Sequence, residues 1–399
     1  MSASARQPPA VIVPDGQTAL GLVRSLAPQG VVCTVCAWNQ LGPAAYSRHA
    51  RVIRCPPPSS GRAFIDALIR IGRSFSTRPV LFTADETSTL LADYAREELS
   101  AHFDLGLASA PQLGDLVYKP RLYQICADAG VPTPETWLLN GEPPPVGLSY
   151  PAVLKPAQRV IHRGNYQTRS FRFEFGAKAV LVRNAAEART IATRAQQLGF
   201  EVLLQRLVAG PVTNLLTAGV FAGRKGGRAL FTARKLAQVP HDFGDGAVVE
   251  GVPLPEVGPP ALRLVEQSGL VGMADIEFKR DSADGQLKLL DVNPRPWLWI
   301  ELATRCGVNL PHLLYEEAIA SRDAATPVQT TDNITWCSTR SLLRIMRRAH
   351  GREGRVALGA AVRAWRRDPS GDDVGWRMAV RQGFWRDLLR AARGQLPEM

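Results

Sequence analysis

The sequence predicts an α/β protein with a parallel α/β domain at its N-terminus and a basic helical extension at its C-terminus. Strand and helix patterns alternate through the first hundred residues, and a β-hairpin pattern with several carboxylates lies near residues 273–295. Residues 336–399 hold 14 Arg, no Lys and 6 acidic residues, which gives them +8 of the net charge of +12. A chain of 399 residues exceeds a single hydrophobic core, so we expect several domains.

Four apolar runs and three helical patterns define the N-terminal domain. The runs predict strands at residues 10–14, 31–37, 50–54 and 80–83, and the helical patterns lie at 17–28, 61–73 and 86–100. Strands that alternate with helices are typical of a parallel sheet. The turn after the first strand lacks Gly-x-Gly-x-x-Gly, which argues against a dinucleotide site. Cys33 and Cys36 lie inside the second run, so we interpret them as part of a buried strand and not as a redox or zinc pair.

Lysines stand at the ends of predicted elements in the next part of the chain. Lys119 lies in a helical segment that ends at Gly130, because the prolines of Val131-Pro-Thr-Pro134 cannot continue it. Residues 150–155 predict a buried strand that ends in Lys155, and residues 178–183 predict its neighbour. The polar segment 158–168 between them does not match Gly-x-x-x-x-Gly-Lys, which excludes a P-loop.

The pattern continues with further strands and helices up to residue 321. Strands are predicted at 201–207, 212–220 and 229–235, and helices at 185–198, 262–269 and before Ser321. Residues 236–246 are predicted to form a loop, because they contain Pro240 and Gly244.

The hairpin near residues 273–295 carries the clearest chemical signal. Two alternating runs flank the turn segment Asp281-Ser-Ala-Asp-Gly285. If the turn centres on Asp284, Glu277 lies directly opposite Asp291, on the same face as Asn293. Like charges placed opposite each other destabilise a sheet unless something lies between them. Two carboxylates and an amide oxygen suit a hard cation such as Mg²⁺, and Arg295 could bind phosphoryl oxygens in a fork. The hairpin therefore predicts a metal–phosphate site.

These residues resemble the magnesium-binding end of the ATP-grasp superfamily, which has a Glu followed by Glu-x-Asn-x-Arg on the next strand. Asp291 stands where Glu is usual, which changes the reach of that ligand. The resemblance extends over residues 8–325. Within the superfamily, the sequence most resembles the D-aspartate-ligase and carbamoyl-phosphate-synthetase large-chain branches. It implies four parts: an N-terminal α/β domain (1–115), a small lobe with its first helix (116–205), a large lobe with the metal site (206–330) and the helical extension (331–399).

The resemblance also implies roles for individual residues. ATP and Mg²⁺, with Mn²⁺ as an alternative, are the implied cofactors. Glu277, Asp291 and Asn293 are the implied metal ligands, and Arg295 and Lys235 are the implied catalytic cations. The implied nucleotide-binding residues are Lys119, Lys155 and Lys178 for the phosphates and the hinge Gln205, Arg206 and Leu207 for adenine. Arg206 replaces the usual acidic residue that reaches the ribose.

Four further side chains are weaker candidates for binding the second substrate. We interpret His162 and His241, which lie in predicted loops, as surface histidines. Glu250 and Asp275 could contact an acceptor amine, or could be structural.

The leading functional prediction is an ATP-dependent ligase that joins a small-molecule carboxylate to an amine through an acyl phosphate. A small-molecule kinase with the same fold is the alternative within the enzyme class. A non-catalytic nucleotide-binding scaffold is the alternative outside it. The sequence leaves a homo-oligomer open.

Location and partners are predicted from composition and from the C-terminal extension. Scattered cysteines, no apolar run near 20 residues and no signal-peptide pattern predict a cytoplasmic protein. The Arg-rich and Trp-containing segment 336–399 could pack on the core or lie on an anionic membrane surface, which would make the protein peripheral at the inner membrane face. Nucleic-acid binding is the least favoured interpretation, because no recognised nucleic-acid-binding fold accompanies the charge.

Overall fold

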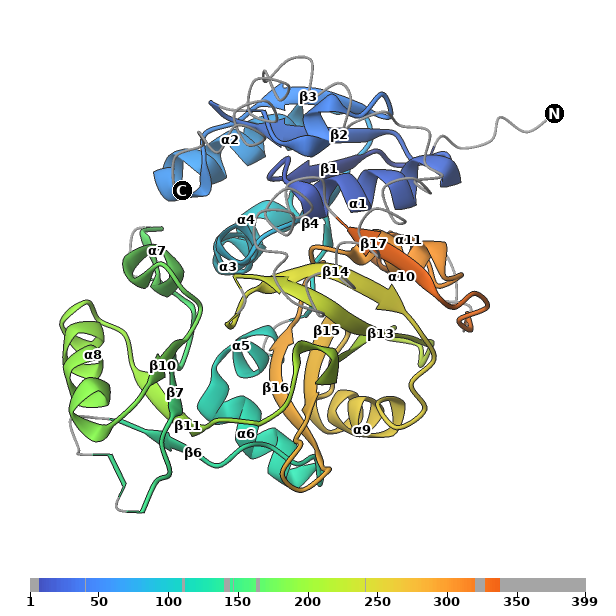
Figure 1. Cartoon of the computed structure of the whole chain (residues 1–399). Helices are drawn as coiled ribbons and strands as arrows, with labels where there is room; N and C mark the ends of the chain where they lie inside the picture. The colour runs from blue at the N-terminus through green and yellow to red at the C-terminus, as the bar shows by residue number, and fades with distance from the viewer. Residues whose placement is uncertain are drawn as a thin grey trace, which may run out of the picture.

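The computed structural model describes residues 7–39, 41–109, 112–139, 144–145, 147–162, 166–240, 242–319 and 327–337. They form an N-terminal parallel sheet, a small antiparallel sheet and a larger antiparallel sheet (Figure 1). The predicted α/β class is therefore confirmed.

The N-terminal sheet has the strand order β3-β2-β1-β4-β5, and all its pairs are parallel. Its strands are β1 (Ala10–Val13), β2 (Cys33–Ala37), β3 (Ala50–Arg54), β4 (Val80–Thr83) and β5 (Asp104–Gly106). Its helices are α1 (Gln17–Leu26), α2 (Arg62–Arg73), α3 (Glu86–Tyr94) and α4 (Arg96–Ser100). Cys33 and Cys36 are buried free thiols within β2, as predicted. The strand order reverses between β1 and β4, and ligands of such sheets bind at the carboxyl ends of the strands beside this point.

The small lobe is a four-stranded antiparallel sheet in the order β10-β7-β11-β6. Its strands are β6 (Thr136–Leu138), β7 (Ala152–Pro156), β10 (Val180–Val182) and β11 (Val202–Arg206), and α8 (Ala185–Gln197) packs against β10 and β11. Helices α5 (Gln112–Val117) and α6 (Lys119–Asp128), which precede β6 in the chain, pack into the core of the larger antiparallel sheet. Helix α8 begins with a reciprocal cap, because Asn184 accepts from the Glu187 amide and Glu187 accepts from the Arg183 amide. Between β7 and β10 lie the short hairpin of β8 (Val160–His162) and β9 (Thr168–Ser170), and helix α7 (Phe171–Phe175).

The large lobe is a six-stranded antiparallel sheet in the order β16-β15-β12-β13-β14-β17. Its strands are β12 (Leu215–Ala222), β13 (Arg228–Val239), β14 (Asp245–Gly251), β15 (Gly272–Arg280), β16 (Leu287–Asn293) and β17 (Ile334–Cys337), and α9 (Gly258–Ser268) packs against it. The predicted loop 236–246 is wrong in extent. β13 continues to Val239 and β14 starts at Asp245, so Pro240 and Gly244 mark only the turn between them.

The C-terminal extension differs from the prediction where the structure describes it. Residues 334–337 form β17, which pairs with β14 and extends the large-lobe sheet beyond residue 330. Residues 338–399 lie outside the described residues, so the predicted amphipathic helices and membrane contact stay predictions. Among the described residues, no helix is long and apolar enough to cross a bilayer.

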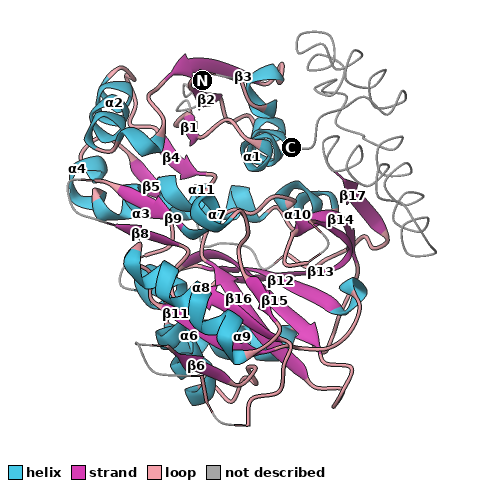
Figure 2. Ribbon diagram, turned by 60° about the vertical axis from the view of Figure 1, so that its left-hand side comes forward, coloured by secondary structure: helices cyan, strands magenta, loops and turns pink. Residues whose placement is uncertain are grey.

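The N-terminal sheet and the large lobe share one hydrophobic core. Helices α1, α10 (Ile300–Arg305) and α11 (Leu310–Ala318) lie between the two sheets (Figures 1 and 2). Ile12 and Leu22 from one side and Phe231 and Trp297 from the other belong to the same buried cluster. A buried ion pair crosses this boundary, with Arg24 Nη1 3.0 Å from Glu301 Oε2.

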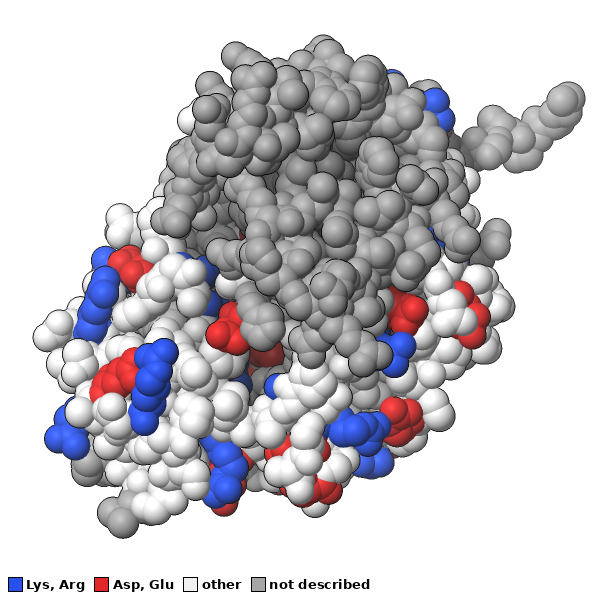
Figure 3. Space-filling model, in the orientation of Figure 1, with Lys and Arg blue, Asp and Glu red and all other residues white. Residues whose placement is uncertain are grey.

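Charged side chains of both signs cover the described part of one face. Figure 3 shows lysines and arginines interspersed with acidic residues there, without a continuous basic surface. Many charged side chains of the described residues are paired, for example Arg280 with Glu256 at 2.8 Å. This distribution gives no support to nucleic-acid binding on the described part of that face.

Candidate active site

The hairpin of β15 and β16 presents four polar side chains on one face. Glu277 lies directly opposite Asp291, as predicted, and Asp275 lies opposite Asn293. The Asn293 Nδ2 atom donates to Asp275 Oδ2 at 3.2 Å and lies 3.4 Å from Glu277 Oε1. The opposite face carries the apolar side chains, which pack into a buried core: Ala274, Ile276 and Phe278. The period of two along each strand therefore keeps the carboxylates on the outer face.

Each side chain predicted as a metal ligand faces a cation from another element. Lys235 Nζ on β13 donates to Glu277 Oε2 at 2.8 Å. Lys119 Nζ, at the start of α6, lies 3.4 Å from Asp291 Oδ1. Arg159 Nη2 donates to Asn293 Oδ1 at 3.1 Å and also pairs with Asp291. The hairpin oxygens are thus arranged to interact with positive charge.

The pKa values of Glu277 and Asp275 shift in opposite directions although the two residues are two positions apart on one strand. Burial opposes the charge of Glu277, but Lys235 and Lys178 lower the pKa of its carboxyl to about 2. Asp275 is 1% exposed, and its burial and the charge of Glu277 raise its pKa to about 6, although the Thr217 hydroxyl donates to it. Glu277 therefore remains an anion at neutral pH, as a cation ligand requires.

A cavity of about 370 Å³ lies in front of the hairpin, between the small-lobe sheet and the large-lobe sheet. All six residues predicted to bind the nucleotide line it: Lys119, Lys155, Lys178, Gln205, Arg206 and Leu207. Lys235, Glu277 and Asp291 line it as well. Apolar side chains such as Val153, Leu181 and Leu290 complete its walls. The structure thus brings residues from α6 and from strands of both lobes to one space.

Lys155 ends inside this cavity on the rigid strand β7. Its Nζ atom donates to Tyr123 Oη at 2.5 Å and to the Leu290 carbonyl oxygen at 3.2 Å. Burial, and then the nearby Lys119 and Arg159, lower the pKa of Lys155 well below its ordinary value. An anion that enters the cavity would raise the pKa of Lys155 again, because a nearby opposite charge favours the charged form of a lysine.

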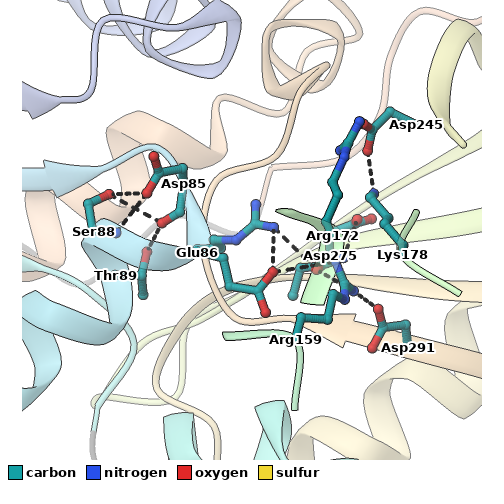
Figure 4. A network of polar contacts seen from close by, with 12 residues as sticks. Asp85, Glu86, Ser88, Thr89, Arg159, Arg172, Lys178, Asp245, Asp275 and Asp291 are labelled. Carbon is teal, nitrogen blue, oxygen red and sulfur yellow. Dashed lines mark hydrogen bonds and ion pairs between the residues drawn. The ribbon is translucent and has the colours of Figure 1, made fainter. Parts of the chain in front are cut away.

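Lys178 makes a contact that the sequence did not predict. Its ammonium group pairs with Asp245 at the start of β14, and Arg172 Nη1 lies 2.7 Å from the same carboxylate (Figure 4). Asp245 belongs to the large lobe, whereas Lys178 and Arg172 belong to the small lobe. This cluster therefore connects the two lobes across the cavity.

The hinge segment Gln205–Leu207 lies at the end of β11. The Gln205 Nε2 atom donates to Thr136 Oγ1 at 2.6 Å and to Tyr123 Oη at 3.1 Å. Arg206, which replaces an acidic residue, pairs with Glu135 at 2.6 Å in an exposed position. The side chain of Arg206 is thus oriented by Glu135, whereas Leu207 follows the strand and borders the cavity.

Arg295 lies in a second, smaller cavity between the hairpin and the N-terminal domain. Its Nη2 atom is 3.5 Å from Asn293 Oδ1 and 3.9 Å from Glu86 Oε2. Glu86 begins helix α3, at the carboxyl edge of the N-terminal sheet, and is also 3.5 Å from Arg159 Nη1. Burial opposes the charge of Glu86, but Arg159 and Arg295 lower its pKa. Arg295 therefore faces the N-terminal domain beside Asn293.

Known proteins match this chain in sequence and in fold. No protein-family model matches it. D-aspartate ligase from Enterococcus faecium (strain Aus0004) is 23% identical over 331 residues, which cover 78% of this chain and 77% of the ligase. The L-amino acid ligase from Bacillus licheniformis superposes with a TM-score of 0.57 and 16% identity, over 82% of this chain and 76% of that protein.

The biotin carboxylase domain of Hydrogenobacter thermophilus 2-oxoglutarate carboxylase, in a structure with MgADP and bicarbonate, has a TM-score of 0.62 and 14% identity, over 83% of this chain and 74% of that one. In the longer Rhizobium etli pyruvate carboxylase, the chain spans 30% of the length. The chain has the ATP-grasp fold. Its two antiparallel sheets are the small and large ATP-grasp lobes, and the 370 Å³ cavity lies between them.

The hairpin oxygens suit the metal that the ATP-grasp fold implies. Glu277 and Asp291 supply carboxylates and Asn293 supplies an amide oxygen, which is the donor set that Mg²⁺ prefers. Among the described residues, no group of three His, Cys, Asp or Glu side chains is placed to hold a metal ion.

The remaining candidates lie in different surroundings. The His162 ring stacks on Tyr94, with centroids 4.0 Å apart, beside Tyr166. Glu250 pairs with Arg234 at 2.7 Å, and Asp275 is buried on the polar face of the hairpin beside Asn293. His241 lies outside the described residues.

Sequence reasoning missed two charged residues that line the cavities, Glu86 and Arg159, and a third, Asp245, that pairs with the cavity residue Lys178. Arg159 lies within the segment 158–168, which was considered only as a whole. Glu86 could have been found from its place directly after β4, at the reversal of strand order. Asp245 carried no local signal, since its partners come from the other lobe.

Proposed function

We propose that this chain is an ATP-dependent carboxylate–amine ligase, which forms an amide through an acyl phosphate and releases ADP and phosphate. The observation that carries the proposal is the convergence of lysines from both lobes and the hairpin oxygens on one cavity. Joining two anions requires the protein mainly to neutralise and position charge, and this cavity is built from charged groups on rigid elements. The similarity to two amino acid ligases supports this reaction class.

The cavity residues divide into two groups in this proposal. Lys119, Lys155 and Lys178 bind the nucleotide phosphates, and the backbone of Gln205–Leu207 borders the adenine. The hairpin side chains Glu277, Asp291 and Asn293 would hold Mg²⁺, or Mn²⁺, which accepts the same oxygen ligands. When bound, the metal would neutralise phosphate charge as it develops.

Two bond exchanges make up the reaction. A carboxylate oxygen forms a bond to the γ-phosphorus of ATP while the bond from that phosphorus to the β-phosphate oxygen breaks, and ADP leaves. The amine then forms a bond to the acyl carbon, the carbon–oxygen bond to phosphate breaks, and the ammonium formed loses its proton to water. Arg295 and Lys235 stabilise the transferred phosphoryl group by charge.

We infer that an amino acid supplies one of the substrates. Two of the similar proteins are a D-aspartate ligase and an L-amino acid ligase. The smaller cavity contains the Glu86 carboxylate and the Arg295 guanidinium, which have opposite charges. At about 20 Å³ this cavity has room for about one water molecule, and Glu86 already lies beside Arg159 and Arg295, so the inference rests on the similar ligases and not on this cavity.

The test is a substrate panel with the full-length protein, ATP and Mg²⁺. D- and L-amino acids are supplied singly and in pairs, while phosphate release and product mass are measured. Phosphate release with an amide product supports the ligase. ADP with a phosphorylated product and no phosphate would identify a small-molecule kinase. Intact ATP across the panel, with nucleotide still bound, would favour a nucleotide-binding scaffold.

A further inference from the structure

Arg159 contacts more parts of the candidate active site than its neighbours on the β8–β9 hairpin do. Its guanidinium donates to Asn293 Oδ1 at 3.1 Å, pairs with Asp291 and lies 3.5 Å from Glu86 Oε2 (Figure 4). These partners come from β16 and from α3, whereas Arg159 precedes β8 in the small lobe. Arg159 also lines both the cavity of about 370 Å³, to which we assign the nucleotide, and the smaller cavity beside Arg295.

The guanidinium approaches the same oxygen atoms that a divalent cation would use. Asn293 has a single side-chain oxygen, and Arg159 donates to it. Asp291 has two oxygens, with Arg159 beside one and Lys119 beside the other. A metal ion bound to these oxygens would meet the positive charge of Arg159 at close range, in a site where the arginine side chain is 13% exposed. The two cations cannot share these oxygens without strong repulsion.

Phosphate oxygens offer Arg159 a second set of partners in the same space. A guanidinium binds phosphate through two parallel hydrogen bonds, which its planar fork favours. The side chain already borders the nucleotide cavity, so a rotation of its long stem can exchange carboxylate partners for phosphate partners. Because Arg159 precedes β8 and is not part of the hairpin of β15 and β16, its side chain can move while the metal ligands stay in place.

We propose that Arg159 competes with the metal ion for Asp291 and Asn293 and leaves these oxygens for nucleotide phosphate when a metal ion or a nucleotide binds. Arg159 is then a binding residue with two alternating sets of partners. This inference rests on the proposed function, since it assigns the metal to the hairpin and the nucleotide to the larger cavity. According to this inference, Arg159 weakens metal binding and strengthens phosphate binding.

Removing the guanidinium should have two opposite effects. In Arg159→Gln, Asp291 and Asn293 lose a competing cation, so a divalent ion without nucleotide binds more tightly. The same variant loses a charge-assisted phosphate partner, so nucleotide without metal binds less tightly. A charge-assisted hydrogen bond corresponds to roughly a tenfold to hundredfold change in affinity. If Arg159 were only structural, its removal would lower the affinity for both the metal and the nucleotide, or would change neither.

The experiment uses the full-length protein and two separate probes. Mn²⁺ binding without nucleotide is measured from the signal of free Mn²⁺ in electron paramagnetic resonance, and ADP binding in EDTA is measured by calorimetry. We expect Arg159→Gln to bind Mn²⁺ about tenfold tighter and ADP about tenfold weaker than wild type. Arg169→Gln is the matched control, because Arg169 lies on β9 of the same hairpin but pairs with Glu174 at 3.6 Å. It should leave both affinities unchanged.

Circular dichroism checks the fold of each variant, and Arg159→Lys serves if the glutamine variant does not fold. The lysine keeps the competing charge but loses the fork, so Mn²⁺ affinity should match wild type while ADP binds less tightly. If Arg159→Gln folds but binds Mn²⁺ no more tightly than wild type does, the inference is overturned. The same holds if neither protein binds Mn²⁺. If only the lysine variant folds, unchanged ADP affinity would overturn it. Wild type that binds neither ADP nor MnADP would instead overturn the proposed function.

Discussion

Lys235 reaches across a whole strand to contact Glu277. Lys235 lies on β13 and Glu277 on β15, with β12 between them in the sheet, yet the two charged atoms are 2.8 Å apart. The side chain of Lys235 is 5% exposed, so the pair is screened little by water. A predicted catalytic cation and a predicted metal ligand are thus joined by a direct contact, and each holds the other in place.

Loss of a hairpin ligand should abolish turnover. We expect Glu277→Gln and Asn293→Ala to retain the fold and to lose Mg²⁺-dependent phosphate release, because each removes an oxygen from a phosphate-bound cation. Asp284→Asn, in the exposed turn of the same hairpin, is the control and should keep full activity. Full activity of Glu277→Gln at low Mg²⁺ would contradict the metal assignment.

Lys155→Ala should weaken nucleotide binding. The side chain ends in the cavity beside Tyr123, and a phosphate would lose a charge-assisted partner that contributes roughly 1.5–3 kcal/mol. We therefore expect MgADP to bind roughly tenfold to hundredfold less tightly in calorimetry. Lys225→Ala, at an exposed turn, should leave the dissociation constant unchanged. An equal constant for both variants would make Lys155 structural.

Nucleotide binding should take up protons. Burial and the neighbouring cations lower the pKa of Lys155, and bound phosphate should raise it again. Between these two pKa values binding adds a proton, so the enthalpy measured in that pH range should depend on whether the buffer is Tris or HEPES. Lys155→Met should reduce this dependence. Equal enthalpies in both buffers for wild type would show that Lys155 is already charged.

The same shift fixes the sign of the effect on stability. The folded protein holds Lys155 at a lower pKa than the unfolded chain does, so the unfolded chain binds more protons between the two values. The contribution of Lys155 to the free energy of unfolding therefore rises with pH in that window, up to about pH 10.4, and is lost as the pH falls. Comparing wild type with Lys155→Met in denaturant titrations isolates this contribution.

Asp245→Asn should strengthen nucleotide binding. The Asp245 carboxylate pairs with Lys178 and so competes with phosphate for that ammonium group. Removing a partly exposed ion pair of about 1 kcal/mol should make MgADP bind about fivefold tighter in calorimetry. Lys178→Met should have the opposite effect. Weaker binding by Asp245→Asn would indicate that Asp245 positions Lys178 instead of competing for it.

Breaking the ion pair between the N-terminal sheet and the large lobe should cost stability. Glu301→Gln leaves the Arg24 charge buried, since their side chains are 11% and 6% exposed, and such losses cost about 3–5 kcal/mol. Glu256→Gln breaks a pair in which both side chains are 40% exposed, and should cost less than about 1 kcal/mol. Urea denaturation measures both. Equal costs would show that Arg24 finds another partner in the variant.

The hairpin was predictable because its signals are local. The period of two and the Asp/Gly turn fix which residues face each other, and Glu277 lies opposite Asp291 as expected. Arg159 and Asp245 were not predictable in this way, because their partners lie on different lobes and meet only through packing. β14 was missed for another reason. Pro240 and Gly244 lie in the turn between β13 and β14, but the sequence alone did not show that this turn is only a few residues long.

The shared core beneath the N-terminal sheet limits how this protein can change its substrate. Ile12 and Leu22 pack in one buried cluster with Trp297 and Phe231, so the N-terminal sheet is not an interchangeable module. If the N-terminal sheet and its helices were replaced by those of a relative, the new side chains would not fit the residues of this cluster. Changes in substrate preference should therefore come from point substitutions at the start of α3, near Glu86, where the carboxyl edge of the sheet meets the smaller cavity.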